Sequence, residues 1–185
     1  MRIIAGVDRG RRLFAPPGRD TRPTADRVKE AMFSVLAAYL PGARVLDVFA
    51  GSGALSLEAL SRGAQTAVLI DKNRKASAAI ARNIALCNAQ TQTQLLVGEA
   101  TRLLAGLSGT FDLVFLDPPY QKGYIAQIEP YMPPLLATDA VVVLETAANE
   151  PERFTLPCWQ LWKESKYGDT AVFYYQYQKE ANCNG

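Results

Sequence analysis

The chain has 185 residues, of which 49% are hydrophobic and 21% are charged, and these values predict a single soluble globular domain. No apolar run approaches the roughly 18 residues of a membrane span, and the arginines that follow residues 1–6 predict no secretory signal. Histidine is absent and the three cysteines form no CxxC pair, so we expect no metal site, no histidine-based triad and free thiols in a reducing cytoplasm.

The N-terminal residues are strongly basic, whereas the rest of the chain is nearly neutral. Residues 1–29 contain eight basic and three acidic residues, a net charge of +5, so the overall charge of +2 leaves −3 for the other 156 residues. Seven of the eight cations are arginine, whose guanidinium forms paired hydrogen bonds with phosphate and stacks on bases. Such a basic arm predicts nucleic-acid binding, and a solvated hairpin with a charged face is the alternative.

The predicted elements begin within this arm. Residues 2–5 and 11–15 read as two short strands around a turn at residues 8–10, which predicts a hairpin. A proline- and glycine-rich linker follows it. We therefore divide the chain into an arm over residues 1–23 and a main domain over residues 24–185.

Beyond the arm, helices and strands alternate along the chain. Hydrophobic residues at helical spacing predict a first helix from Thr24 to about Tyr39. The alternation predicts an α/β fold with a mostly parallel sheet and helices on both faces. Two strand-like runs at the end, with no helix between them, predict a hairpin that gives the sheet an antiparallel edge strand. The expected strands lie at 43–48, 66–71, 93–97, 111–116, 140–145, 159–166 and 170–178. The expected helices lie at 53–62, 73–87, about 100–106 and about 122–136, the last interrupted by Pro130, Pro133 and Pro134.

A glycine-rich turn joins the first strand of the sheet to the next helix. Gly51 and Gly53 let backbone N–H groups approach a ligand closely, and Asp71, which ends the following strand, is placed for ribose hydroxyls. A dinucleotide fits poorly, because Ser56 replaces the third glycine and Asp47 would lie close to a pyrophosphate. Asp47 instead suits the cationic amino acid part of S-adenosyl-L-methionine. The expected cofactor-binding residues are Asp47, Phe49, Ala50, Gly51, Ser52, Gly53, Asp71, Lys72, Glu99 and Ala100.

A second motif, Asp117-Pro118-Pro119-Tyr120, follows the predicted strand at 111–116. Two prolines fix φ and remove backbone donors, so this turn is stiff. It also lies where ligands bind in open α/β sheets, outside the carboxyl end of a strand. A carboxylate, a carbonyl and a ring held there could grip a flat base by its exocyclic amino group, so we expect these four residues to be catalytic. An ordinary strand-to-loop turn is the alternative.

Together the two motifs resemble those of class I S-adenosylmethionine-dependent methyltransferases that modify amino groups. Further blocks, in the same order and spacing, are similar to the bacterial 16S ribosomal RNA guanine-N(2) methyltransferase family. They are residues 2–6, 21–24, 26–30, 49–55, 58–64 and 117–120. The resemblance covers nearly the whole chain, although Asp71 stands where the family often has Glu and residues 146–185 match only loosely.

The resemblance implies a Rossmann-like methyltransferase fold and methylation of a guanine amino group in 16S ribosomal RNA, with S-adenosyl-L-methionine as cofactor. The partner would be free 16S ribosomal RNA or a small ribosomal subunit particle, and we expect a cytoplasmic monomer with no membrane or metal partner. The expected RNA-binding residues are Arg2, Arg9, Arg11, Arg12, Arg22, Thr24 and Arg27.

Other functions stay open from the residues alone. One is an amino methyltransferase that acts on adenine or cytosine in DNA, or on a protein amide. Another is a non-catalytic RNA-binding assembly factor with the same fold, which the intact glycine turn, Asp71 and the Asp-Pro-Pro-Tyr motif argue against. A nicotinamide oxidoreductase is disfavoured by Ser56 and by the lack of a second nucleotide-binding half.

Overall fold

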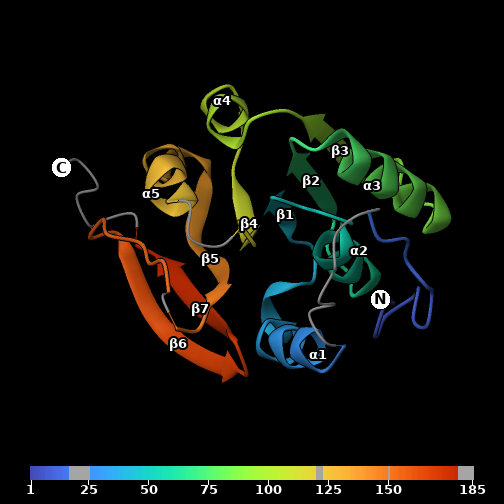
Figure 1. Cartoon of the computed structure of the whole chain (residues 1–185), viewed down its shortest axis with the longest axis horizontal. Helices are drawn as coiled ribbons and strands as arrows, with labels where there is room; N and C mark the ends of the chain where they lie inside the picture. The colour runs from blue at the N-terminus through green and yellow to red at the C-terminus, as the bar shows by residue number, and fades with distance from the viewer. Residues whose placement is uncertain (17–25, 120–122, 150, 179–185) are drawn as a thin grey trace.

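The fold is built on a seven-stranded sheet with helices on both faces (Figure 1). The computed structural model describes residues 1–16, 26–119, 123–149 and 151–178. Neighbouring strands follow the order β3-β2-β1-β4-β5-β7-β6. The strands are β1 (Arg44–Val48), β2 (Thr66–Asp71), β3 (Thr93–Val97), β4 (Phe111–Leu116), β5 (Leu136–Ala147), β6 (Trp159–Tyr167) and β7 (Thr170–Tyr177).

The strand order reverses between β1 and β4. From β1 the chain builds outward through β2 and β3, and it then returns to place β4 on the other side of β1, with every one of these pairs parallel. Open α/β sheets bind ligands at such a switch point, outside the carboxyl ends of the strands. The turns after β1 and β4, which carry the two sequence motifs, therefore meet beyond the carboxyl ends of these central strands.

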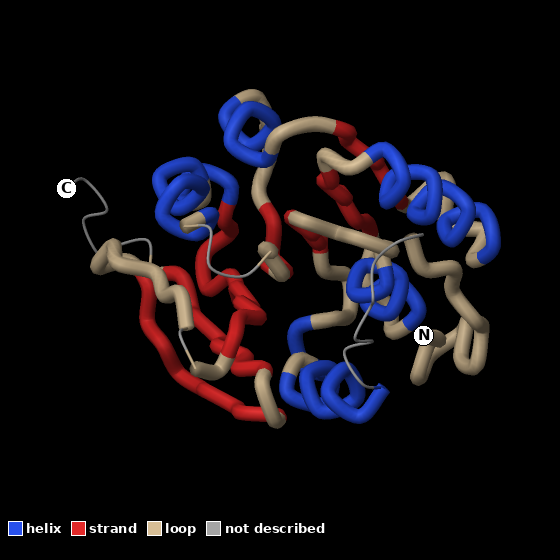
Figure 2. The backbone as a smooth tube through the Cα atoms, viewed as in Figure 1, coloured by secondary structure: helices blue, strands red, loops and turns tan. Residues whose placement is uncertain are grey.

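Helices cover both faces of the sheet (Figure 2). Side chains alternate along β1, so that Val45 lies in one buried cluster while Leu46 and Val48 lie in the other. Residues of α1, α2 and α3 pack in the Val45 cluster, and residues of α4 and α5 pack in the opposite one. The helices are α1 (Asp26–Val35), α2 (Ala54–Ser61), α3 (Arg74–Leu86), α4 (Ala100–Ala105) and α5 (Tyr124–Ile128), with 3-10 turns η1 (Ala37–Tyr39), η2 (Glu129–Tyr131) and η3 (Pro133–Leu135).

The Rossmann-like α/β architecture and the C-terminal hairpin are confirmed. β6 and β7 pair antiparallel, as predicted, and β6 is the edge strand. The hairpin enters the sheet in reverse, because β7 pairs antiparallel with β5 and lies between β5 and β6. β7, the last strand that the structure describes, is therefore an inner strand.

The helix expected over about 122–136, with interruptions at Pro130, Pro133 and Pro134, forms as one short helix followed by two 3-10 turns. Within the described residues this segment forms only α5, followed by η2 and η3, and β5 begins early, at Leu136. Pro130 lies in the first two positions of η2, and Pro133 and Pro134 open η3. Proline is tolerated at the start of a helical turn, where its missing N–H has no partner to lose, but it breaks a helix interior.

The N-terminal hairpin forms, although one bridge between Arg2 and Arg12 replaces the two expected strands. Ile3 donates its backbone N–H to the Arg11 carbonyl at 2.9 Å, and Gly10 donates to the Ile3 carbonyl at 2.9 Å. Ile3 and Leu13 belong to the core cluster beneath α1, α2 and α3. The hairpin is thus packed against the body of the protein.

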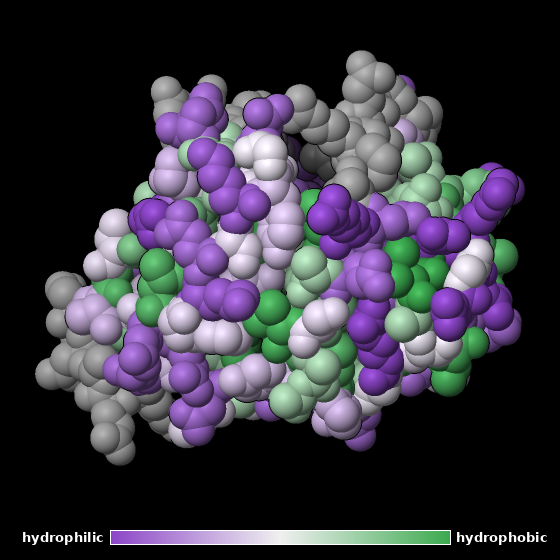
Figure 3. All heavy atoms as spheres, turned by 90° about the horizontal axis from the view of Figure 1, so that it is seen from below, coloured by the Kyte–Doolittle hydropathy of each residue, from purple (hydrophilic) through white to green (hydrophobic). Residues whose placement is uncertain are grey.

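Cys87 is a buried free thiol, as expected. Within the described ranges, no helix is long and apolar enough to cross a membrane. On the face that Figure 3 shows, hydrophobic side chains occur in patches among hydrophilic ones.

Candidate active site

Three carboxylates gather where β1, β2 and β4 end. Val48 of β1 pairs with Ile70 of β2 and with Leu116 of β4. Asp71 and Asp117 each come one residue after those partners, so they flank the end of β1 on its two sides. Asp47, one residue before Val48, is close enough that both carboxylates act electrostatically on its side chain. The structure thus brings together the acids that the sequence predicted from two separate motifs.

The glycine-rich turn adopts backbone conformations that only glycine holds without strain. Gly51 has φ 61° and Gly53 has φ 75°, both in the left-handed region. A Cβ at Gly53 would also lie 3.0 Å from the Leu69 side chain. Phe49 has φ 72°, which is unusual for a residue with a side chain and is the kind of strain that clusters at functional sites.

Asp71 ties the end of β2 to this turn. One carboxylate oxygen accepts the Gly51 backbone N–H at 2.8 Å, and the other accepts the Asn73 N–H at 2.8 Å. The side chain is nearly buried, with 9% of its residue exposed. Because each carboxylate oxygen has two lone pairs, both oxygens keep an acceptor site for a ligand hydroxyl.

Asp47 is buried against the start of α2. Its carboxylate accepts the Ser56 hydroxyl at 2.8 Å and the Ser56 backbone N–H at 3.3 Å. Burial raises the pKa of the Asp47 carboxyl from 3.8 to about 7, the Ser56 hydrogen bonds oppose that rise, and the charges of Asp117 and Asp71 add to it. A cation placed beside Asp47 would favour its ionised form, and so would offset both the cost of burying the charge and the repulsion from Asp117 and Asp71.

Polar and aromatic side chains link the segments that follow the carboxyl ends of these strands. Lys72, after β2, lies 3.5 Å from the Glu99 carboxylate, at the start of α4, and donates to the Tyr124 hydroxyl at 3.1 Å. The Tyr124 ring in turn lies 5.4 Å from the Phe49 ring, centre to centre. Hydrogen bonding to Tyr124, with the nearby Glu99 charge, raises the pKa of Lys72.

Sequence reasoning missed the parts that Tyr124 and Ser56 play here. Ser56 was visible only as a missing glycine, whereas it is the hydrogen-bond partner of Asp47. Tyr124 opens α5, and no pattern in the sequence marked it as a partner of Lys72. Of the remaining predicted cofactor residues, Ala100 is buried at the start of α4, and Ala50 and Ser52 lie in the turn beside the glycines.

The Asp-Pro-Pro-Tyr motif begins at the carboxyl end of β4, beside the same group of acids. Asp117 is half-buried, Pro118 is buried and Pro119 is half-buried, and the charge of Asp117 acts on Asp47. Tyr120 lies outside the described residues, and its stacking role stays a prediction. The ribosomal RNA contacts expected from Arg22 and Thr24 also fall outside them.

The remaining predicted RNA-binding arginines differ in how far the fold already uses them. Arg11 pairs with Asp8 at 2.9 Å and donates to the Leu86 carbonyl, and Arg2 pairs with Asp26 at 2.9 Å. Arg9, Arg12 and Arg27 are exposed and form no ion pair with another described residue.

One buried carboxylate, Glu58 of α2, anchors the hairpin that carries these arginines. Glu58 is fully buried and accepts the backbone N–H groups of Ile4 at 2.7 Å and Ala5 at 3.0 Å. Lys29 of α1 lies 3.1 Å from it, and Arg62 lies 2.7 Å from it. The hairpin and α1 are therefore held by the same side chain.

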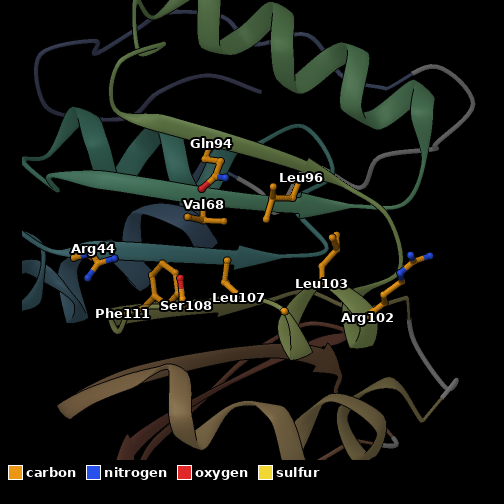
Figure 4. A pocket seen from close by; sticks show the side chains of 10 residues that line it. Arg44, Val68, Gln94, Leu96, Arg102, Leu103, Leu107, Ser108 and Phe111 are labelled. Atoms are coloured by element: carbon orange, nitrogen blue, oxygen red, sulfur yellow. The ribbon is translucent and has the colours of Figure 1, made fainter.

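A pocket of about 420 Å³ lies elsewhere, on the face of the sheet next to α4 (Figure 4). Val68, Leu96 and Phe111 line its floor, with Arg44 and Arg102 among its other residues. None of the predicted site residues lines this pocket. Within the described part of the chain, no cluster of three or more histidine, cysteine or acidic side chains could hold a metal ion.

Comparisons with known proteins support the resemblance seen in the sequence. The family described as Conserved hypothetical protein 95 matches residues 1–176. The Escherichia coli (strain K12) protein named "Ribosomal RNA small subunit methyltransferase D" is 38% identical over 183 residues, covering 98% of this chain and 91% of that protein. The Bacillus subtilis protein named "Putative rRNA methyltransferase YlbH" is 35% identical over 183 residues, covering 95% and 98%.

Solved structures agree with the fold. The structure described as "Putative methyltransferase yhhF from Escherichia coli" aligns with a TM-score of 0.86 at 36% identity, covering 97% of this chain and 99% of that one. A Streptococcus pyogenes "conserved hypothetical protein" aligns with a TM-score of 0.75 at 43% identity, covering 82% and 96%. Matches over nearly the full length, at these identities, show common descent as well as a common fold. The chain therefore belongs to the Conserved hypothetical protein 95 family.

Proposed function

We propose that this chain is an S-adenosylmethionine-dependent methyltransferase that modifies the exocyclic amino group of a guanine in 16S ribosomal RNA. The observation that carries the proposal is the meeting of Asp47, Asp71 and Asp117 beside the glycine-rich turn. The names of the Escherichia coli and Bacillus subtilis relatives support ribosomal RNA as the substrate. We further propose that the protein works as a cytoplasmic monomer, on free RNA or on a small-subunit particle.

The residues at the carboxyl ends of β1, β2 and β4 fit the chemistry of S-adenosylmethionine. Asp71 would hold the ribose hydroxyls with its remaining lone pairs. Asp47 would face the cationic amino acid part, whose charge favours the ionised carboxyl. Lys72, Glu99 and Ala100 would lie along the adenosine. When bound, S-adenosylmethionine supplies an electrophilic methyl group on a positively charged sulfur.

The acceptor side must make a poor nucleophile react. The lone pair of a guanine amino nitrogen is delocalised into the ring, so the nitrogen is planar and weakly nucleophilic. Asp117 and the Pro118 carbonyl would accept hydrogen bonds from the amino N–H groups, which favours a pyramidal nitrogen with a free lone pair. Because both acceptors are fixed on a stiff turn, most of the acceleration comes from positioning and electrostatics.

Neither a metal nor a histidine is required for this role. The amino nitrogen becomes positively charged as its new bond to carbon forms, and its proton then leaves readily. Asp117 stabilises that developing charge while it holds the N–H groups. The target base must first leave its stack, at a cost of a few kcal/mol, and stacking on Tyr120 would return roughly 1–3 kcal/mol.

Nucleoside mass spectrometry of 16S ribosomal RNA tests the proposal. RNA from cells that lack this chain should lose one N2-methylguanine, and wild-type protein should restore it in vitro, whereas the Asp117→Ala variant should not. Parallel reactions on naked RNA and on small-subunit particles identify the preferred substrate. Unchanged guanine methylation, or methyl transfer to adenine or cytosine instead, would contradict the proposal.

A further inference from the structure

A single buried amide joins the N-terminal hairpin to the cofactor turn. Asn83, on α3, is fully buried. Its amide nitrogen donates to the Phe14 carbonyl at 2.9 Å and to the Ser52 carbonyl at 2.9 Å, and its oxygen accepts the Phe14 N–H at 2.8 Å. Both amide hydrogens and the oxygen are thus committed, one of them to the turn that holds Gly51 and Gly53.

A second contact connects the same two segments. The Ser52 hydroxyl donates to the Met1 sulfur at 3.2 Å, and Ser52 is only 6% exposed. Ser52 is therefore held on both sides, at its carbonyl by Asn83 and at its side chain by the first residue of the hairpin. Holding that carbonyl fixes the orientation of the peptide between Ser52 and Gly53, which is where the turn would meet a ligand.

The hairpin is rigid enough to transmit such a contact. Glu58 binds its backbone at Ile4 and Ala5, and the Ser61 hydroxyl donates to the Ala5 carbonyl at 2.6 Å. The segment that carries Phe14 is bridged to the segment anchored in this way, through Arg2 and Arg12. Anchored, hydrogen-bonded segments therefore connect the exposed arginines of the hairpin to Phe14.

We propose that Asn83 is a positioning residue that couples RNA binding at the hairpin to cofactor binding at the glycine-rich turn. RNA held by the hairpin then favours the orientation of the Ser52 carbonyl that binds the cofactor. RNA thus strengthens cofactor binding, and the cofactor strengthens RNA binding by the same factor. This inference rests on the proposed function, because it takes the hairpin as an RNA contact.

Calorimetry of S-adenosylhomocysteine, with and without saturating unmethylated 16S ribosomal RNA, measures the coupling. In the wild-type protein the RNA should tighten S-adenosylhomocysteine binding about fivefold or more, within the usual range for linked sites. In the Asn83→Ser variant, the ratio of the S-adenosylhomocysteine affinity with RNA to that without RNA should be near one. Phe14→Ala is the matched control, because it removes the ring under Arg82 but keeps both backbone bonds to Asn83, so the ratio should stay as in wild type.

Hydrogen exchange on the wild-type protein provides a test that needs no variant, in case Asn83→Ser does not fold. RNA should slow amide exchange in residues 50–57 even without cofactor. A wild-type ratio of one, a wild-type ratio in folded Asn83→Ser, or unchanged exchange in that peptide would each overturn the coupling. A separate assay with S-adenosylmethionine distinguishes the two failures. If the wild-type protein methylates the same RNA there, only the coupling has failed, and if it neither binds nor methylates the RNA, the proposed function has failed.

Discussion

The Lys29 ammonium lies 3.1 Å from the Glu58 carboxylate, and neither side chain is more than 2% exposed. A buried ion pair stabilises a fold little compared with an apolar pair, but removing one partner leaves a charge stranded in the interior. Here the stranded charge would be Lys29, whose ammonium also donates to the Arg2 carbonyl.

We therefore expect Glu58→Ala to reduce the free energy of unfolding by about 3–5 kcal/mol. Lys29→Met should cost less, because Glu58 keeps Arg62 and two backbone donors. Urea unfolding measures both variants. Glu164→Ala is the control, since its pair with Arg153 is exposed and should contribute less than about 1 kcal/mol. Equal, small effects for Glu58→Ala and Glu164→Ala would disprove the anchoring role.

The buried Asp47 carboxyl predicts how stability depends on pH. Its folded pKa, about 7, exceeds the unfolded value of 3.8, so the folded protein holds more protons between these pH values. Stability should therefore fall as pH rises toward 7, and Asp47→Asn should remove that loss, on the order of 4 kcal/mol at most. Denaturant titrations at pH 5 and pH 8 compare the two proteins. A pH-independent difference between them would show that burial does not control this carboxyl.

Asp71 is expected to determine cofactor affinity. Asp71→Ala removes the acceptor of the Gly51 N–H as well as the proposed ribose contact, so S-adenosylhomocysteine should bind at least tenfold more weakly. Asp71→Glu keeps the charge but displaces it by one methylene, and its affinity should lie between the two. Calorimetry with NADH as the comparison ligand tests whether the site binds S-adenosylmethionine or a dinucleotide. Tight NADH binding without a response to S-adenosylhomocysteine would contradict an S-adenosylmethionine site.

Asp117 should matter for transfer and little for the cofactor. Asp117→Ala should abolish methyl transfer in single-turnover assays while leaving the affinity for S-adenosylhomocysteine within a few-fold of wild type. Tyr120→Ala should slow transfer less, because stacking contributes roughly 1–3 kcal/mol. Near-normal turnover of Asp117→Ala would refute its place in the acceptor grip.

The exposed arginines of the hairpin should set the salt dependence of RNA binding. Changing Arg9 and Arg12 together to Gln should reduce the slope of log affinity against log salt by about 1.5–2, or somewhat less on single-stranded segments. Arg11→Gln should instead lower stability, because Arg11 already bonds Asp8 and the Leu86 carbonyl. An unchanged slope in the folded double variant would mean that the hairpin only packs on the protein.

The sequence predicted what depends on local pattern. Apolar runs and turn residues located the strands, and the glycine turn and Asp71 followed from their place at the strand ends. What it could not predict are contacts between distant segments. Asn83 meets Phe14 across 69 residues and Glu58 meets Ile4 across 54, and neither residue belongs to a periodic pattern that marks it. The prolines after α5 were visible, but whether they bend or end a helix depends on the packing around them.

The inner position of β7 has a consequence for synthesis. A nascent chain leaves the ribosome from its N-terminus, and β5 emerges well before β7 (Thr170–Tyr177), the one described strand that pairs with the outer side of β5. Until then β5 exposes an unpaired edge of buried character, a surface that other chains can pair with. A polypeptide truncated before residue 170 would leave that edge unpaired permanently, so we expect such fragments to aggregate rather than to fold as smaller domains.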